Sequence, residues 1–161
     1  MVNPKNPISD LTLTQLRDIY LGKIRDWKDI GGNPGRIVVV SRDSSSGTFG
    51  VWKDMVMLGD RVVKSRLIVP SNGGIVQAIA KTPGAIGYIG LGYMSDEVKA
   101  VSVNGVEATD ESSLDGTFPI VRGLFMFTNG WPDGETQDFI DFLLSPEGQG
   151  LVKKARSIPL F

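Results

Sequence analysis

The residue types best suited to binding an anion stand together in the segment Ser41–Gly50. Arg42 supplies a guanidinium whose charge is fixed, and a run of hydroxyl side chains continues to Ser46 and Thr48. Gly47 lets the backbone approach a ligand closely, and the N–H groups at the start of a helix would add donors at its positive end. These donors are suited to holding a tetrahedral oxyanion, and no neighbouring group is suited to transforming one.

The elements predicted on either side would bring these donors together. The apolar run Ile37–Val40 is typical of a buried strand. A helix from Thr48 to about Leu58 would carry Phe49 and other apolar side chains on its inner side. The same residue types also fit a purely structural junction, because Ser and Thr commonly cap helices and an Arg next to Asp43 often forms a solvated ion pair. The segment alone supports both interpretations.

Strands alternate with helices along the chain, which predicts an α/β fold with a mixed central sheet flanked by helices and a C-terminal helical tail. A capping box at Thr12–Gln15 begins the first helix, which should end at Gly22. The dipeptide Asn104-Gly105 predicts a hairpin that adds antiparallel character. The other predicted strands are Leu67–Val69 and Ala85–Ile89, and other helices are expected from Gly73 or Gly74 to Ala80, after Asp133-Gly134 and after Ser145-Pro146.

Two further polar clusters are interpreted as structural. Ser71–Gly74 begins a helix with small polar residues, but it contains no arginine, which favours a cap and turn over a ligand site. Asp110, Glu111 and Asp115 stand among small polar residues, which favours a solvated loop over a metal site. We therefore expect no metal ion and no cofactor.

Composition excludes several classes of function. The chain has 161 residues, 41% of them hydrophobic, which is enough for one sizeable core. A net charge of −1 does not indicate the basic surface that binds nucleic acid. No apolar run approaches the roughly 20 residues that span a bilayer. The absence of histidine and cysteine excludes Ser-His-Asp and thiol catalysis, disulfides and thiolate zinc sites. A serine hydrolase using Ser46 would lack a base, so we do not expect an enzyme.

Arg42 followed by Ser46-Gly47-Thr48 resembles the R-x-x-x-S-G-T signature of the phosphate-binding proteins that serve ABC-type phosphate transporters. In that family an acidic residue often stands two positions after the arginine, whereas here Ser44 occupies that position and Asp43 is adjacent to the arginine. The resemblance covers nearly the whole chain, from about residue 3 to 160. Further family-like segments are Asn3–Pro7, Leu13–Trp27, Pro83–Tyr88 and Phe142–Gln149.

The resemblance implies a periplasmic-binding-protein-like clamshell that holds phosphate between two lobes. Residues 8–120 would form the second lobe, and residues 121–161 would be a returning strand and helices of the first lobe, most of which this chain lacks. Arg42 would pair with phosphate oxygens, Ser46 and Thr48 would donate hydroxyls, and the N–H groups of Gly47 and Thr48 would complete the site. The implied partners are inorganic phosphate and a membrane permease. The implied location is extracytoplasmic, although the start at Met1–Pro4 has no signal-peptide pattern.

Alternatives of other kinds stay open on the sequence. The chain could bind sulfate or molybdate instead of phosphate, or it could be a structural or signalling module of the same fold without a ligand. The tail helices would present Phe139, Leu143 and Leu144 on one side, and Leu151, Val152 and Ala155 inward on the next helix. Half a clamshell cannot enclose the anion, so water competes for its hydrogen bonds, which predicts weakened phosphate binding. Without the first lobe the apolar faces of the tail would be exposed, which favours a homodimer through the tail.

Overall fold

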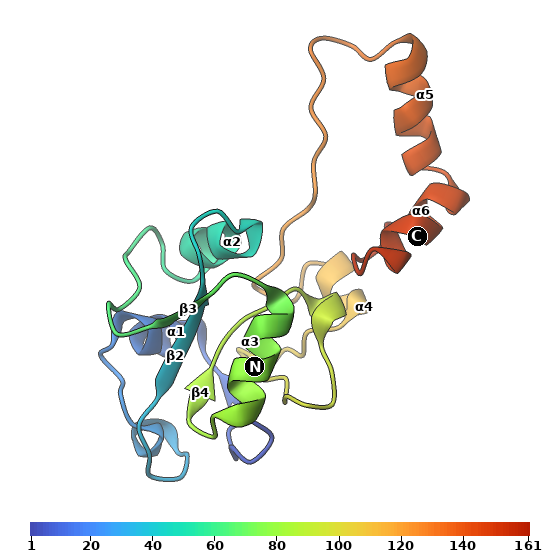
Figure 1. Ribbon diagram of the computed structural model, residues 1–161. Coiled ribbons are helices and arrows are strands. Elements are labelled where there is room, and N and C mark those ends of the chain that lie inside the picture. Colours follow the sequence, from blue (N-terminus) through green and yellow to red (C-terminus); the bar gives the residue numbers. More distant parts are fainter. The chain divides into compact units, whose positions relative to one another are not determined.

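Three parallel strands carry the segment that contains Arg42. The computed structural model describes all residues 1–161. In it, β2 (Val38–Arg42) lies between β3 (Leu67–Val69) and β4 (Ala85–Ile86), in the order β3-β2-β4 (Figure 1). Val40 pairs with Leu67 and Val38 with Ala85. Because all three strands run parallel, their carboxyl ends share one edge of the sheet, where ligands of open α/β sheets bind.

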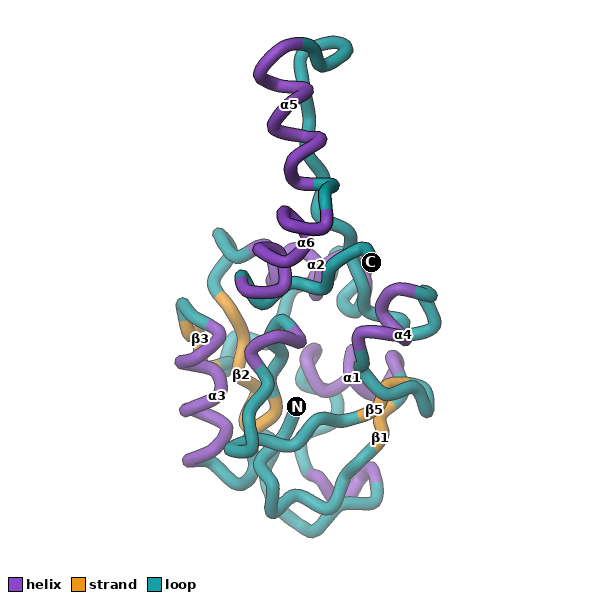
Figure 2. The backbone as a smooth tube through the Cα atoms, turned by 90° about the vertical axis from the view of Figure 1, so that its right-hand side faces the viewer, coloured by secondary structure: helices purple, strands orange, loops and turns teal.

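Both faces of this sheet are covered, which explains why β2 begins with three consecutive valines, Val38–Val40, before the polar Ser41 and Arg42 at its end. Helix α3 (Asn72–Lys81) lies on one face and α1 (Leu13–Leu21) on the other, as Figures 1 and 2 show together. Val38 and Val40 pack in the cluster that α3 contributes to, whereas Val39 packs in the cluster that α1 contributes to. The alternation follows from the period of two residues in a strand.

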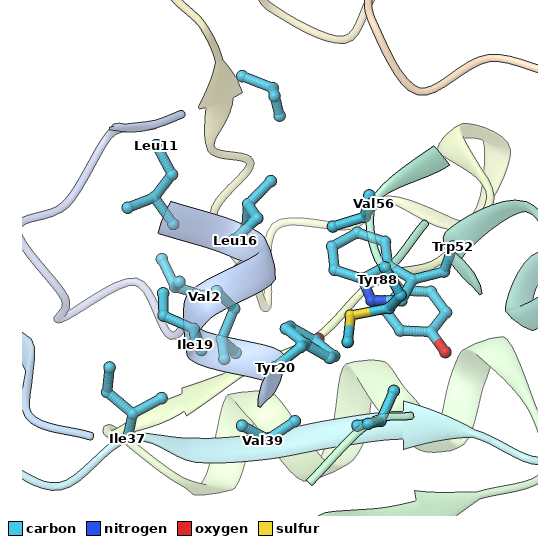
Figure 3. Packing of buried hydrophobic residues seen from close by; sticks show 14 of the residues in the cluster. Val2, Leu11, Leu16, Ile19, Tyr20, Ile37, Val39, Trp52, Val56 and Tyr88 are labelled. Carbon is cyan, nitrogen blue, oxygen red and sulfur yellow. The ribbon is translucent and has the colours of Figure 1, made fainter. Parts of the chain in front are cut away.

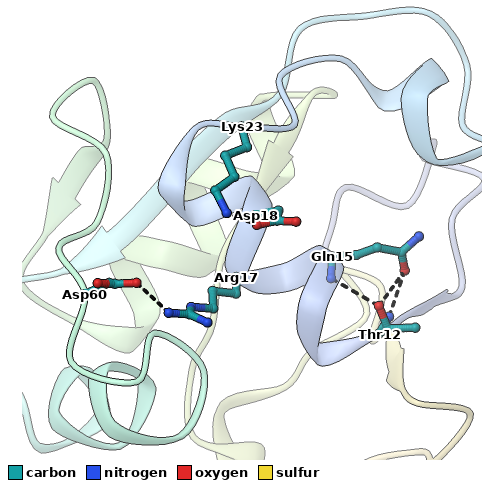
Figure 4. Close-up of polar contacts among 6 residues, drawn as sticks. All are labelled: Thr12, Gln15, Arg17, Asp18, Lys23 and Asp60. Carbon is teal, nitrogen blue, oxygen red and sulfur yellow. Dashed lines mark hydrogen bonds and ion pairs between the residues drawn. The ribbon is translucent and has the colours of Figure 1, made fainter.

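Helix α1 begins and ends where the sequence predicts. The Thr12 hydroxyl accepts the N–H of Gln15, and the Gln15 side chain accepts the N–H of Thr12, which is a capping box (Figure 4). Gly22 ends the helix with φ 76°, a left-handed conformation that glycine adopts without steric cost. The same close-up shows Arg17 of this helix bonded to Asp60 at 2.6 Å.

The antiparallel part of the expected mixed sheet is smaller than predicted. Asn104 and Gly105 do form the expected turn, with φ of 53° and 79°. However, the only antiparallel pairing at this turn is an isolated bridge between Val103 and Val106, and β5 (Ser102–Val103) pairs in parallel with β1 (Asp10–Leu11) along its other edge. Isolated bridges also join Val2 to Ile86 and Lys99, and Asp26 to Arg36.

Three short helices complete the first compact unit, Met1–Val121. The segment expected as an acidic loop contains α4 (Asp110–Leu114), which Thr109 caps through a capping box with Ser112. The sequence interpretation was wrong there because the cap at Thr109 was not recognised. The 3-10 helices are η1 (Trp27–Ile30) and η2 (Leu91–Tyr93).

Large aromatic side chains form the part of the core that supports α2 (Gly47–Met55). Tyr20, Trp52 and Tyr88 are all buried, and the rings of Trp52 and Tyr88 stack at 4.3 Å with an interplanar angle of 6° (Figure 3). Tyr20 packs against Trp52 at 4.6 Å between ring centroids. Such aromatic pairs contribute about 0.5–1.5 kcal/mol to stability beyond the burial of their surface. Because Trp52 belongs to α2, this cluster holds α2 against the core.

The second compact unit, Arg122–Phe161, contains α5 (Gly134–Leu143) and α6 (Pro146–Lys154). Ser145 caps α6 with Pro146 at its first turn, as predicted. The expected returning strand is not formed, because residues 122–133 pair with no other strand. Leu151 and Ala155, which were expected to face inward, are exposed, and only Val152 is half-buried. No helix of the chain is long and apolar enough to cross a membrane.

Candidate anion-binding site

The segment expected to bind an anion forms a strand-to-helix junction at the carboxyl end of β2. Ser46 has extended backbone angles and its hydroxyl accepts the N–H of Phe49 at 3.4 Å, so α2 begins at Gly47, one residue before the predicted start. The N–H groups of Gly47 and Thr48 bond to no group of the chain. The first N–H groups of a helix have no partner within it, and they lie at its positive end. The junction therefore offers two free backbone donors.

Asp43 shapes this loop from within. Its carboxylate accepts the N–H of Ser45 at 3.0 Å and also the Ser45 hydroxyl, while its carbonyl accepts the N–H of Ser46 at 3.2 Å. The hydrogen bonds from Ser45 hold the pKa of the Asp43 carboxyl below its usual value. The carboxylate is therefore committed to the turn and does not bond to the guanidinium of Arg42.

The Arg42 guanidinium is held instead by the loop between β3 and α3. Nη1 donates to Oδ1 of Asn72 at 2.8 Å, and Nη2 donates to the carbonyl oxygen of Pro70 at 2.9 Å. Nε is buried and has no hydrogen-bond partner. No carboxylate forms an ion pair with Arg42, although the nearby charge of Asp43 interacts with it and helps to lower the pKa of that carboxyl. The guanidinium thus has no direct anionic partner at this edge of the sheet.

Tyr88, which follows β4, fixes the backbone of Arg42. Its hydroxyl accepts the N–H of Arg42 at 3.2 Å and lies 2.9 Å from the hydroxyl of the fully buried Ser41. Burial raises the pKa of Tyr88, so the phenol stays protonated at neutral pH. Arg42 is thus held by residues that follow the carboxyl ends of β3 and β4, on either side of its own strand.

Sequence reasoning placed Arg42, Ser46, Gly47 and Thr48 on one segment. In the structure Arg42 ends β2 and the other three residues form the cap and first turn of α2, while the guanidinium is directed to Asn72 and Pro70. Sequence reasoning missed Asn72 and Tyr88, which lie 30 and 46 residues beyond Arg42. Ser71 does cap α3, accepting the N–H of Gly74 at 3.0 Å, as the sequence indicated. The contact of this turn with Arg42 depends on the parallel pairing of β2 with β3, which places the carboxyl ends of the two strands side by side.

The comparisons with known proteins agree on one family. A model described as a PBP superfamily domain matches residues 1–147. The chain is 32% identical to the phosphate-binding protein PstS of Borreliella burgdorferi, over 96% of this chain and 60% of that protein. It is 33% identical to PstS of Bacillus subtilis, over 92% of this chain and 49% of that protein. The chain thus spans about half to three fifths of the length of these relatives.

Solved structures give the same result. A putative phosphate ABC transporter substrate-binding protein from Clostridium perfringens, with bound phosphate, has a TM-score of 0.85 and 38% identity, over 99% of this chain and 67% of that one. An ABC-type phosphate transport receptor from Vibrio cholerae has a TM-score of 0.84 and 29% identity, over 95% and 65%. The expected periplasmic-binding-protein-like α/β fold is confirmed. The chain therefore belongs to the PBP superfamily, in the family of ABC-type phosphate-binding proteins that includes PstS.

Proposed function

We propose that this chain binds inorganic phosphate at the carboxyl end of β2. The guanidinium of Arg42, which forms no ion pair, carries the proposal, because it stands at the same junction as the free N–H groups of Gly47 and Thr48. Arg42 pairs with phosphate oxygens, and Ser46 and Thr48 donate their hydroxyl protons. The Ser46 oxygen already accepts a backbone N–H, which leaves its proton for the ligand.

The whole-protein role follows from the family. We assign residues 8–120 to the second lobe of a solute-binding protein and residues 121–161 to its first lobe; a division into compact units between Val121 and Arg122 supports this assignment. Such a receptor works outside the cytoplasm and delivers phosphate to the membrane permease of an ABC transporter. Its role is binding without catalysis, since the carboxylate of the junction, Asp43, is hydrogen-bonded within the turn and the remaining groups are hydrogen-bond donors.

No observation favours the alternatives. Nothing singles out sulfate or molybdate as the ligand, and the intact donor set gives no reason to assign a ligand-free module. No observation supports a homodimer through α5 and α6 either.

The direct test is a phosphate titration of the 161-residue chain followed by amide NMR. We expect the resonances of Gly47 and Thr48 to shift, with a dissociation constant in the high micromolar range or weaker. The reason is that Gly47 is exposed in this chain, so water competes for the donors. Nanomolar binding, or shifts confined to another region, would contradict the proposal.

Substitution of Arg42 tests its role directly. Arg42→Ala should abolish the phosphate-induced shifts of the amide resonances, while the thermal unfolding temperature stays close to that of the parent. Arg42→Lys should restore little, because an ammonium cannot reproduce the bidentate fork of a guanidinium. Arg61→Ala is the matched control, since Arg61 is an exposed arginine of the same unit. If both Arg42 variants bind phosphate like the parent, the site lies elsewhere, and Ser71–Gly74 becomes the next candidate.

A further inference from the structure

The loop between β3 and α3 has a second role besides capping α3. We propose that Asn72 is a positioning residue of the phosphate site, which holds the Arg42 guanidinium in place through its side-chain oxygen. The carbonyl of Pro70 provides the second point of contact. The inference rests on the proposed function, because it assigns Asn72 a role through Arg42.

Three contacts from two neighbouring segments fix Arg42 before any ligand arrives. Tyr88 accepts its backbone N–H, Asn72 accepts from Nη1 and Pro70 accepts from Nη2. A free arginine side chain loses rotamer entropy when it is immobilised. Because part of that loss is already incurred on folding, the anion meets an ordered donor, which strengthens binding.

Both acceptors on the guanidinium are neutral, and this matters for an anion site. A carboxylate in the same place would orient Arg42 equally well, but it would neutralise the charge that attracts phosphate. The acidic residue next in sequence, Asp43, is hydrogen-bonded to Ser45 and acts on Arg42 only through space. Amide and carbonyl oxygens orient the guanidinium and leave its charge available.

Asn72 can act as a support because its own position is fixed. It is the first residue of α3, directly after the cap Ser71, and it is half-buried. At Gly74 an added Cβ would lie 2.6 Å from Cγ1 of Val69, so the start of α3 packs closely against β3. Since β3 is hydrogen-bonded to β2, Asn72 is held at a set position relative to Arg42.

The test compares Asn72→Ala and Asn72→Asp with the parent, using the 161-residue chain and inorganic phosphate. Asn72→Ala should weaken phosphate binding by about twofold to tenfold. Alanine is a good helix former and the Ser71 cap remains, so the unfolding temperature should stay close to that of the parent. Asn33→Ala, a change at an exposed asparagine, is the matched control.

A second readout follows Arg42 itself and separates position from charge. NMR of the guanidinium should show slow rotation in the parent and fast rotation in Asn72→Ala. Asn72→Asp keeps the acceptor atom, so rotation should stay slow, yet phosphate binding should weaken because of the added negative charge. A merely structural role for Asn72 would not produce this pattern.

Each other outcome overturns the inference. Equal phosphate affinity in Asn72→Ala and the parent would show that the contact does not position Arg42 for the anion. Tighter binding by Asn72→Ala would mean that the contact holds Arg42 away from the ligand. If Asn72→Ala does not fold, the test rests on Asn72→Asp. Fast rotation of the Arg42 guanidinium in that variant, or a phosphate affinity equal to that of the parent, would overturn the inference. A parent chain that binds no phosphate would instead reveal a failure of the proposed function, visible before any variant is made.

Discussion

Two buried tyrosines of the same aromatic cluster each bond to the backbone of β2, but at different places. The Tyr88 hydroxyl accepts the N–H of Arg42, whereas the Tyr20 hydroxyl donates to the carbonyl of Val40 at 3.0 Å. Both side chains are at most 7% exposed, so each hydroxyl is costly to remove. Only Tyr88 contacts Arg42, the residue proposed to bind phosphate.

This difference yields a matched pair of variants. Tyr88→Phe leaves the N–H of Arg42 without its acceptor and should lower the free energy of unfolding by about 1–3 kcal/mol. It should also weaken phosphate binding. Tyr20→Phe should destabilise the chain by a similar amount and leave phosphate affinity unchanged. Denaturant unfolding and phosphate titration of both variants check this, and equal affinities in the two would contradict it.

At this scale the sequence indicates a junction made of residues that are neighbours in the chain, and it misses the contacts that Arg42 makes with residues far along the chain. Arg42, Ser46 and Thr48 are recognisable because a strand-to-helix junction needs only neighbours in the chain. Asn72 carries no local signal, since an asparagine after a serine cap is ordinary at the start of a helix. Its contact with Arg42 depends on the pairing of β2 with β3, which local patterns do not specify.

The element scale is best tested at the start of α3, where two adjacent glycines differ in their surroundings. A Cβ at Gly73 would meet nothing within 4 Å, whereas one at Gly74 would lie 2.6 Å from Cγ1 of Val69 and 3.0 Å from Oγ of Ser71. Valine is stiff at χ1, so it cannot move aside easily, and the Ser71 oxygen is the cap of the helix.

Gly73→Ala should therefore stabilise the chain by about 0.5–1 kcal/mol, because alanine loses less backbone entropy in a helix. Gly74→Ala should destabilise it by about 1–3 kcal/mol, through overpacking and a disturbed cap. Thermal and denaturant unfolding of the two single variants measure the difference. Equal stability would show that α3 does not pack closely on β3 in solution.

Elements with complete local signals were predicted well, and the hairpin shows why others were not. The capping box at Thr12–Gln15 and the stop at Gly22 both formed as expected, because each involves only neighbouring residues. Asn104 and Gly105 also adopted the left-handed angles of the predicted turn. After the turn there is only a bridge from Val106 to Val103, and the strand partner of β5 is β1, about ninety residues earlier in the chain, which local patterns do not specify.

At the scale of the whole molecule, the two units differ in their cores. All fully buried hydrophobic side chains belong to Met1–Val121, and none to Arg122–Phe161. In the second unit the buried residues are Gly148 and Gln149. The Gln149 amide joins the unit by donating to the Leu143 carbonyl at 2.7 Å and accepting the N–H of Leu160 at 2.8 Å. A forty-residue segment without a core is marginally stable.

Hydrogen exchange should separate the two units. We expect the amides of β2 and α3 to exchange only through global unfolding, and those of α5 and α6 to exchange far faster. Exchange followed by mass spectrometry resolves the two groups. Protection of α5 that lasts as long as that of α3 would mean that the tail is stabilised by contacts beyond those within its own unit.

The segment 122–133 has a practical consequence for anyone who purifies this protein. Its backbone pairs with no strand, and Phe125, Phe127 and Trp131 are 74%, 91% and 96% exposed. A protease that cuts after aromatic residues meets its preferred side chains on an accessible, extended backbone. A single cut there would leave Arg42 and every residue that holds it on one fragment. Limited digestion is thus a route to a shorter fragment that contains the complete junction and lacks α5 and α6.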